Sequence, residues 1–293
     1  LAEIAKDILE NDPVGALQYG ISEGNIALRK KILEMMAQRE SIHASLDEIT
    51  IVSGGQQAIE ISSKILLNEG DYVLVEEPSF VGALNAFRSY GANLCGIECD
   101  NEGMNIEKLE HALKTEKSVK LIYVIPTFQN PSGITTTLER RKQILELAEK
   151  YGVMILEDNP YGDLRFDGED VATIKSMDKT GIVAYAGTFS KTLSPGLRLG
   201  FLICNEQMME KVVVCKQVND VHSCVLSQMI CAEFFKRYDF DEHVKKIQVL
   251  YRKKAHLMMD EMENLRKDKN PAFAYCSARY FMAFHGKEPV GRI

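Results

Sequence analysis

The sequence lacks an excess of basic residues: 35 Lys and Arg oppose 42 Asp and Glu, which leaves a net charge of −7. Without a basic field, the chain has little to attract a nucleic-acid backbone or an anionic lipid surface. It also lacks any run near the roughly 20 apolar residues of a membrane span, and no signal-peptide pattern precedes the first helical stretch. We therefore expect a soluble protein of the cytoplasm with no nucleic-acid partner and no membrane contact.

The chain also lacks any CxxC pair and the His/Cys spacing of a zinc site, although it has seven cysteines. An odd number of cysteines without a pairing pattern is typical of free thiols in a reducing cytosol. No metal site is predicted. The seven are Cys95, Cys99, Cys204, Cys215, Cys224, Cys231 and Cys276.

Both ends of the chain lack the features of a finished polypeptide. The first residue, Leu1, enters an amphipathic helical pattern directly, and residues 270–293 settle into no clear element. We expect these 293 residues to be part of a longer protein. A chain of this length buries a sizeable core and favours one large domain with a smaller satellite.

Short apolar strands alternate with helical patterns along most of the chain. The predicted strands include EITIVSG, DYVLVEE, KLIYVIP, VMILED and IVAYAGT, and the predicted helices include GQQAIEISSKILL and TTLERRKQILELAEKYG. Strands that are apolar throughout and alternate with helices indicate βαβ crossovers. The sequence therefore predicts an α/β fold with a mostly parallel central sheet and helices on both faces.

The helical pattern that begins near residue 206 predicts a connection to a second, smaller domain. We predict a large domain over residues 14–205 and a connecting helix over residues 206–240. Residues 241–293 are expected to form part of a smaller α/β domain, together with residues 1–13.

Polar residues, glycines and prolines gather where five predicted strands end. In open parallel sheets, ligands bind outside the carboxyl ends of the strands, where the loops converge. We therefore expect the functional site at that edge of the sheet. The five segments are SGGQQ (53–57), EEPSF (76–80), PTFQNPSG (126–133), EDNPYG (157–162) and GTFSK (187–191).

Two of these segments have more than one interpretation when taken alone. The glycines of SGGQQ, at the start of a helix, let backbone N–H groups approach a phosphate. A glycine turn chosen only for its geometry would look the same. Asp158 ends the apolar strand VMILED and needs a cationic or proton-donating partner there. That partner is a ligand, a helix end or an arginine such as Arg165.

The stretch GTFSKTLSPGLRLGF places Lys191 among hydroxyl residues and glycines, seven positions before Arg198. A desolvated lysine near other cations is a nucleophile that condenses with carbonyls. Arginine binds phosphate bidentately, and Thr188 and Ser190 add hydroxyl donors for the same phosphate. A carbonyl-reactive lysine beside a phosphate cradle describes a pyridoxal 5′-phosphate (PLP) site.

PLP also needs a carboxylate at its pyridine nitrogen, which keeps the ring protonated as an electron sink. Asp158, at the end of another predicted strand, can supply that carboxylate. Asn130 and Tyr161 offer donors to the phenolic oxygen, and Phe80 offers a flat face for the ring. Each residue alone is ambiguous, but the five strand-end segments together predict a PLP site.

These motifs, in this order, resemble those of the class I/II aminotransferases of PLP fold type I. The resemblance is closest to the branch of 2-aminoadipate, kynurenine and multi-substrate aminotransferases. It covers most of residues 17–225, from LQYGISEGNIALRKKI through SGGQQAI, DYVLVEEPSF, YVIPTFQNPSG and LEDNPYGDLRFDG to GTFSKTLSPGLRLGF and KQVNDVHS.

The resemblance implies a role for each matching residue. Lys191 bonds to the cofactor aldehyde and later shuttles the proton of transamination, and Asp158 holds the pyridinium nitrogen. Tyr161 and Asn130 bind the phenolate oxygen. Phe80 stacks on the ring, where relatives usually have a tyrosine or another aromatic residue. The implied phosphate ligands are Gly55 and Gln56, through their backbone, with Thr188, Ser190 and Arg198.

Tyr19, in LQYG, matches a tyrosine that in relatives reaches the phosphate of the neighbouring subunit's cofactor. This match implies a homodimer with shared active sites. An ordinary loop aromatic is the other interpretation of this residue.

The resemblance implies a PLP-dependent aminotransferase that moves the amino group between an L-amino acid and a 2-oxo acid such as 2-oxoglutarate, by a ping-pong mechanism. One alternative is a PLP-dependent lyase or decarboxylase of the same fold. The other is the aminotransferase-like sensor domain of a bacterial transcription regulator. Stoichiometric consumption of 2-oxoglutarate would distinguish an aminotransferase from the lyase or decarboxylase. A basic winged-helix segment ahead of Leu1 would favour the transcription regulator.

Overall fold

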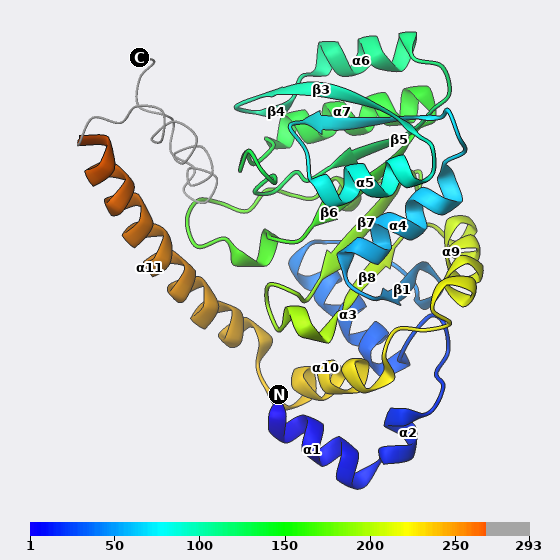
Figure 1. Ribbon diagram of the computed structural model, residues 1–293, viewed down its shortest axis with the longest axis vertical. Coiled ribbons are helices and arrows are strands. Elements are labelled where there is room, and N and C mark those ends of the chain that lie inside the picture. The colour runs from blue at the N-terminus through cyan, green and yellow to red at the C-terminus, as the bar shows by residue number, and fades with distance from the viewer. Residues whose placement is uncertain (268–293) are drawn as a thin grey trace.

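The computed structural model describes residues 1–267 and, within them, places an eight-stranded sheet at the centre (Figure 1). The strands lie in the order β1-β8-β7-β6-β5-β2-β3-β4. Their bounds are β1 Ile49–Val52, β2 Tyr72–Glu77, β3 Asn93–Asp100, β4 Gly103–Met104, β5 Val119–Val124, β6 Met154–Asn159, β7 Val183–Thr188 and β8 Gly200–Ile203.

Most of the sheet is parallel, as the alternating pattern predicts. Strands β3, β2, β5, β6 and β7 pair in parallel, whereas β8 is antiparallel to both of its neighbours, β7 and β1. Because β1 and β7 both oppose β8, they run in the same direction. The carboxyl ends of β1, β2, β5, β6 and β7 therefore share one edge, and β8 begins at that edge.

The reversal at β8 follows from the short connection that precedes it. A parallel neighbour needs a crossover of a dozen or more residues, usually a helix. The connection between β7 and β8 is only residues 189–199, with a turn at residues 190–193 and the short η3 (Pro195–Leu197), and the chain returns directly beside β7.

Helices cover both faces of the sheet, and α7 begins and ends at capping residues. Thr137 caps the first turn of α7, and Gly152 ends that helix in the left-handed conformation with φ 65°. The helices are α1 Ala2–Asn11, α2 Pro13–Leu17, α3 Ile26–Arg39, α4 Gly55–Leu66, α5 Val81–Ser89, α6 Ile106–Thr115, α7 Leu138–Tyr151, α8 Ile174–Met177, α9 Glu206–Asn219, α10 Val225–Arg237 and α11 Phe240–Lys267. Two further short turns are η1 Leu46–Glu48 and η2 Gly162–Leu164.

The sheet has one apolar cluster on one face and two on the other. Because successive strand residues point to opposite faces, Leu156 packs under α4, α5 and α9, whereas Ile155 packs on the other face under α6 and α7. A third cluster joins α1, α3 and α10 to β1, β7 and β8. This helical cover on both faces fixes the strands and thereby the loops at their carboxyl ends.

The connecting helix predicted over residues 206–240 is wrong as a single element. The chain forms two helices, α9 and α10, separated by a turn at residues 220–224. Asp220 leaves the helical conformation, and Val221 has φ 63°, in the left-handed region that a β-branched residue rarely adopts. A regular helix does not continue through such a residue.

The division into two domains stays a prediction, because residues 268–293 of the expected smaller domain lie outside the described residues. Within the described part, α1 packs with α10 in one cluster, and α11 extends away from the sheet (Figure 1). Over residues 1–267, no helix is both long and apolar enough to cross a membrane.

Candidate active site

Three backbone segments of the shared edge touch where β1, β7 and β8 meet. A Cβ atom added at Gly200 would lie 2.7 Å from the carbonyl oxygen of Gly187, 3.0 Å from the carbonyl carbon of Gly54 and 3.1 Å from the amide nitrogen of Gly55. Only glycine fits at that point, because backbone atoms have no freedom to move aside. The glycines of GTFSK, LGF and SGG therefore place the two predicted loops side by side.

The predicted phosphate ligands gather around this glycine junction. A Cβ atom at Gly54 would lie 2.5 Å from Nη2 of Arg198, which also donates to the carbonyl of Ser53 at 3.3 Å. Thr188 donates to the Ser190 hydroxyl at 3.0 Å. The amides of residues 55 and 56 open α4, where the helix dipole favours an anion. The set combines a guanidinium, two hydroxyls and helix-start amides, which is the chemistry that binds a phosphate.

Asp158 lies directly beside this phosphate-binding set. A Cβ atom at Gly55 would lie 3.8 Å from Cβ of Thr188 and 4.0 Å from Oδ1 of Asp158. The missing side chain at Gly55 thus leaves space between the helix start and the end of β6. A ligand that carries a phosphate at one end and a cationic N–H at the other meets a suitable partner on each side of this space.

The Asp158 carboxyl is buried, with 6% of the residue exposed. Its Oδ2 accepts a hydrogen bond from the Tyr123 hydroxyl at 2.8 Å. Burial raises the pKa of Asp158 to about 7, and the Tyr123 hydrogen bond opposes that rise. The salt bridge to Arg165, the alternative interpretation from sequence, is not what forms, because Arg165 pairs with Asp170 at 3.1 Å. A protonated ring nitrogen would stabilise the ionised carboxylate in this buried place.

Sequence reasoning missed two buried residues next to Asp158. Tyr123 is fully buried on β5, and Glu76 on β2 is 2% exposed and accepts a hydrogen bond from the Ile125 amide at 3.0 Å. Burial raises the pKa of Glu76 to about 8, and the charge of Asp158 contributes to this rise. The signal was a tyrosine and a glutamate within otherwise aliphatic strands, KLIYVIP and DYVLVEE.

The remaining predicted cofactor residues come from two linked loops. The half-buried Phe80 ring lies over Gly82, where a Cβ atom would meet the ring at 2.4 Å and Oε1 of Gln56 at 2.7 Å. The Gln56 side chain donates to the Gly82 carbonyl at 2.9 Å. Gln129, beside Asn130, donates to the carbonyl of Pro78 at 2.8 Å. The loops that carry Phe80 and Asn130 are therefore tied together at the shared edge.

Three predicted residues have different surroundings. The desolvation expected of Lys191 is not found, because the residue is exposed on the loop that follows β7, one position after Ser190. Tyr161 is half-buried and precedes η2, just past the end of β6. Tyr19 is 80% exposed, and its ring meets the ring of His222 edge-on at 5.7 Å. The structure therefore brings Lys191 and Tyr161 to the shared edge and leaves Tyr19 outward.

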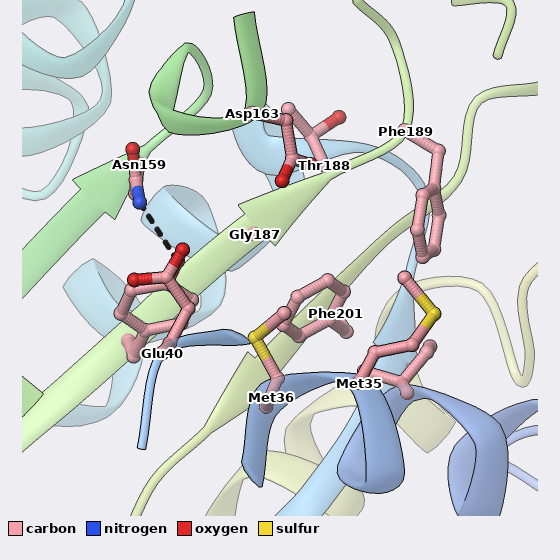
Figure 2. Close-up of a pocket in the computed structure, with 11 residues that line it drawn as sticks. Met35, Met36, Glu40, Asn159, Asp163, Gly187, Thr188, Phe189 and Phe201 are labelled. Carbon is pink, nitrogen blue, oxygen red and sulfur yellow. Dashed lines mark hydrogen bonds between the residues drawn. The ribbon is translucent and has the colours of Figure 1, made fainter. Parts of the chain in front are cut away.

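A separate cavity lies on the opposite face of β7 (Figure 2). There Asn159 donates to the Tyr185 hydroxyl at 2.9 Å, and Met35 and Met36 of α3 form the floor. Because neighbouring strand residues alternate, Asp158 points away from this cavity and Asn159 points into it. Among the predicted site residues only Thr188 lines the cavity, so it is distinct from the candidate active site.

The sheet order, the helices on both faces and the glycine-lined edge are those of PLP fold type I. A solved structure with this fold, α-aminoadipate aminotransferase from Thermus thermophilus complexed with N-(5'-phosphopyridoxyl)-L-leucine, matches at a TM-score of 0.84 and 34% identity. The match covers 90% of this chain and 66% of the other. The model of the family "Aminotransferase class I and II" matches residues 1–278, and the chain belongs to that family.

Two curated relatives extend the comparison. Aromatic-amino-acid aminotransferase 1 of Thermococcus litoralis is 40% identical over 92% of this chain and 65% of its own length. The HTH-type transcriptional regulator YisV of Bacillus subtilis, whose name marks it as uncharacterized, is 32% identical over 99% of this chain and 62% of its own length. The chain thus spans slightly less than two thirds of the length of these two relatives.

Proposed function

We propose that the protein is a PLP-dependent aminotransferase that transfers an amino group from an L-amino acid to a 2-oxo acid. The carrying observation is the buried Asp158 carboxyl facing the space left by Gly55, beside the phosphate-binding set of Thr188, Ser190 and Arg198. Family membership over residues 1–278 supports the same reaction class.

The family resemblance supports the following role for each residue of the site. Asp158 would keep the pyridine nitrogen of PLP protonated, and Tyr161 and Asn130 would bind its phenolate oxygen. Phe80 covers the ring face. Bound PLP supplies the electron sink that makes the α-proton of an amino acid acidic. With PLP bound, the Lys191 amine would be the group that condenses with the cofactor aldehyde, and as a free amine it would move the α-proton as general base and acid.

The phosphate end is held by the amides of residues 55 and 56, by the two hydroxyls of Thr188 and Ser190, and by Arg198. The guanidinium is fixed against Gly54 by its hydrogen bond to the Ser53 carbonyl. The ligand would thus be bound at its phosphate by these groups and at its ring nitrogen by the Asp158 carboxylate. Fixation at two points would restrict the ligand to one orientation in the site.

The first prediction concerns Lys191. Borohydride reduction of the PLP-loaded protein is expected to fix one pyridoxyl group, and peptide mass analysis is expected to find it on Lys191. Lys191→Ala should lose the label and the near-visible absorption band, because no amine is left at the reactive position. Lys142→Ala, an exposed lysine on α7, serves as the control and should keep both. A label on another lysine of the unsubstituted protein contradicts the assignment.

The reaction class is tested with a panel of L-amino acids and 2-oxoglutarate. A transaminase consumes 2-oxoglutarate in a one-to-one ratio with the donor and shows parallel lines in double-reciprocal plots, as a ping-pong mechanism requires. Release of CO₂ or an alkene product without consumption of the 2-oxo acid would identify a lyase or decarboxylase instead.

The similarity to YisV favours a second candidate, the sensor domain of a transcription regulator. A DNA-binding assay on the full-length protein distinguishes this candidate from the enzyme. A regulator would bind a defined DNA fragment with an affinity that changes with the amino acid or PLP, whereas the enzyme would turn over the donor and leave DNA unbound.

We further propose a homodimer in the cytoplasm. The outward Tyr19, together with the exposed Val14, Leu17, Ile21 and Ile26 around it in sequence, supports a subunit interface at this surface. The cysteines of the described residues are free thiols, which suits a reducing compartment.

A further inference from the structure

A fully buried lysine lies behind the glycine loop of the site. Lys216 of α9 is 0% exposed, and its ammonium makes four hydrogen bonds. Two go to the Asp220 carboxylate at 2.9 and 3.0 Å, one to Gln57 Oε1 at 3.0 Å and one to the Ser223 hydroxyl at 3.0 Å. A buried charge is costly unless it is paired and bonded in this way.

These partners hold the glycine loop from both of its ends. Gln57 Oε1 also accepts from the Ser53 amide at 2.7 Å, and Gln57 Nε2 donates to Asp220 at 2.9 Å. The Ser53 hydroxyl bonds to Asp220 and to Ser223, each at 3.0 Å. Ser53 comes just before residues 54–56 and Gln57 just after them. The network built on Lys216 therefore bonds to both sides of the turn that opens α4.

Charge and geometry assign the network a positioning role. Burial lowers the pKa of Lys216, and the Asp220 carboxylate opposes that effect. Burial alone would raise the pKa of Asp220, but hydrogen bonds from Gln57 and Lys216 outweigh that effect and lower the pKa. The two charges neutralise each other, so their net field at the site is small and the effect passes through Gln57 and Ser53.

The same network restrains a strained turn. Val221 has φ 63°, a strained conformation for a residue other than glycine, and such a conformation persists only when its surroundings hold it. The carbonyl of Lys216 accepts from the amides of Asp220 and Val221, each at 3.0 Å. The turn at residues 220–224 is thereby shaped to present Asp220 and Ser223 to the glycine loop.

We propose that Lys216 is a positioning residue that holds residues 53–57 in the phosphate-binding conformation. The inference rests on the proposed function, since it concerns the same cofactor site. On this proposal, the Lys216 network strengthens binding of the phosphate group of PLP and has no effect on binding of its aldehyde. Pyridoxal, which has the aldehyde without the phosphate, separates the two effects.

The test compares PLP and pyridoxal binding to the cofactor-free protein by absorption titration. Lys216→Met is expected to weaken PLP binding by about tenfold or more, since loop order and at least one hydrogen bond to a charged group are lost. Pyridoxal binding should change by less than about twofold, because the aldehyde reacts with Lys191 in either protein. Gln57→Met, which removes the linking amide without leaving a buried charge, should show the same selectivity and carries the test alone if Lys216→Met fails to fold.

A matched control separates loop positioning from loss of stability. Lys175→Met breaks another Lys–Asp ion pair close in sequence, Lys175 to Asp178 at 2.9 Å, at the end of α8 in the segment ahead of β7. It should lower the thermal midpoint without changing the ratio of PLP to pyridoxal affinity. Equal losses of PLP and pyridoxal affinity in Lys216→Met and Gln57→Met would overturn the proposal.

Inorganic phosphate makes the test independent of the proposed reaction. In the unsubstituted protein, phosphate should slow hydrogen exchange at the amides of residues 55 and 56, and Lys216→Met and Gln57→Met should lose that protection. If PLP fails to bind but this difference appears, the proposed function fails and the positioning role stands. If the protection is the same in all three proteins, the positioning role fails.

Discussion

At the scale of a single residue, the buried Asp158 carboxyl destabilises the cofactor-free protein when it is ionised. Its pKa is raised from an ordinary value of 3.8 to about 7 by burial. The folded, cofactor-free protein therefore binds this proton more tightly than the unfolded chain does. The stability linked to Asp158 is fully present below pH 3.8 and is lost as the pH rises to about 7.

Asp158→Asn removes this titration and keeps an acceptor for the Tyr123 hydroxyl. In the cofactor-free state, its free energy of unfolding should equal that of the parent near pH 4 and exceed it at pH 8 by an amount on the order of a few kcal/mol. Chemical denaturation at several pH values measures this difference. Glu76 contributes in the same direction, because the Asp158 charge helps to raise the pKa of Glu76 to about 8 and that contribution is lost in Asp158→Asn.

With PLP present, the sign of the Asp158→Asn effect should reverse. The neutral amide no longer holds the pyridinium charge, so cofactor affinity falls and turnover drops by at least about a hundredfold, in line with the loss of an electrostatic partner at a reacting group. A variant that turned over at the parental rate would contradict the electron-sink role of Asp158.

At the scale of elements, the glycine junction decides how closely β8 approaches β7 and the start of α4. Gly200→Ala places a methyl group against three backbone atoms that have no room to move. We expect a loss of about 1–3 kcal/mol in unfolding free energy from overpacking. We also expect weaker PLP binding, because the loop of residues 53–56 is pushed outward.

Gly152→Ala is the control for this substitution. Gly152 ends α7 with φ 65°, and a Cβ atom there would have nothing within 4 Å. The left-handed conformation alone should cost roughly 1–2 kcal/mol, so stability falls by a similar amount. Parallel denaturation and PLP titrations are expected to show a stability loss in both variants and an affinity loss only in Gly200→Ala. Unchanged PLP affinity in Gly200→Ala would separate the junction from the cofactor site.

At the scale of the whole molecule, we expect the exposed apolar surface near α2 to join two subunits. Leu17 is 71% exposed and lies two residues before Tyr19. Leu17→Arg would bring two like charges together across a two-fold interface, since the same patch faces itself there. Sedimentation of the full-length protein should therefore show a dimer for the parent and a monomer for the variant, with weaker PLP binding once Tyr19 no longer faces a partner.

Leu138→Arg provides the comparison, because Leu138 is also an exposed apolar residue but begins α7, at the end of the molecule away from α2 (Figure 1). It should remain dimeric. A parent protein that sediments as a monomer at all accessible concentrations would refute the shared active site.

The sequence predicted most of the fold because its signals are local. Apolar strands such as KLIYVIP, helix caps such as Thr137 and stop signals such as Gly152 act within a few residues of their own position. The gathering of polar residues at strand ends followed from the direction of a parallel sheet alone. The break at residues 220–224 was missed because Val221 gives no local signal for a left-handed turn; hydrogen bonds to Lys216 and the glycine loop hold it there.

What the sequence by itself determined is the alternation of strand and helix, the family resemblance and the residue types at each strand end, since these depend on local periodicity and short motifs. Only the tertiary structure decided that Tyr123 bonds to Asp158, that Glu76 is buried beside it, and that Lys216 underlies the glycine loop. The physical reason is that burial and hydrogen-bond partners arise from strands and helices distant in sequence. No local pattern contains that information.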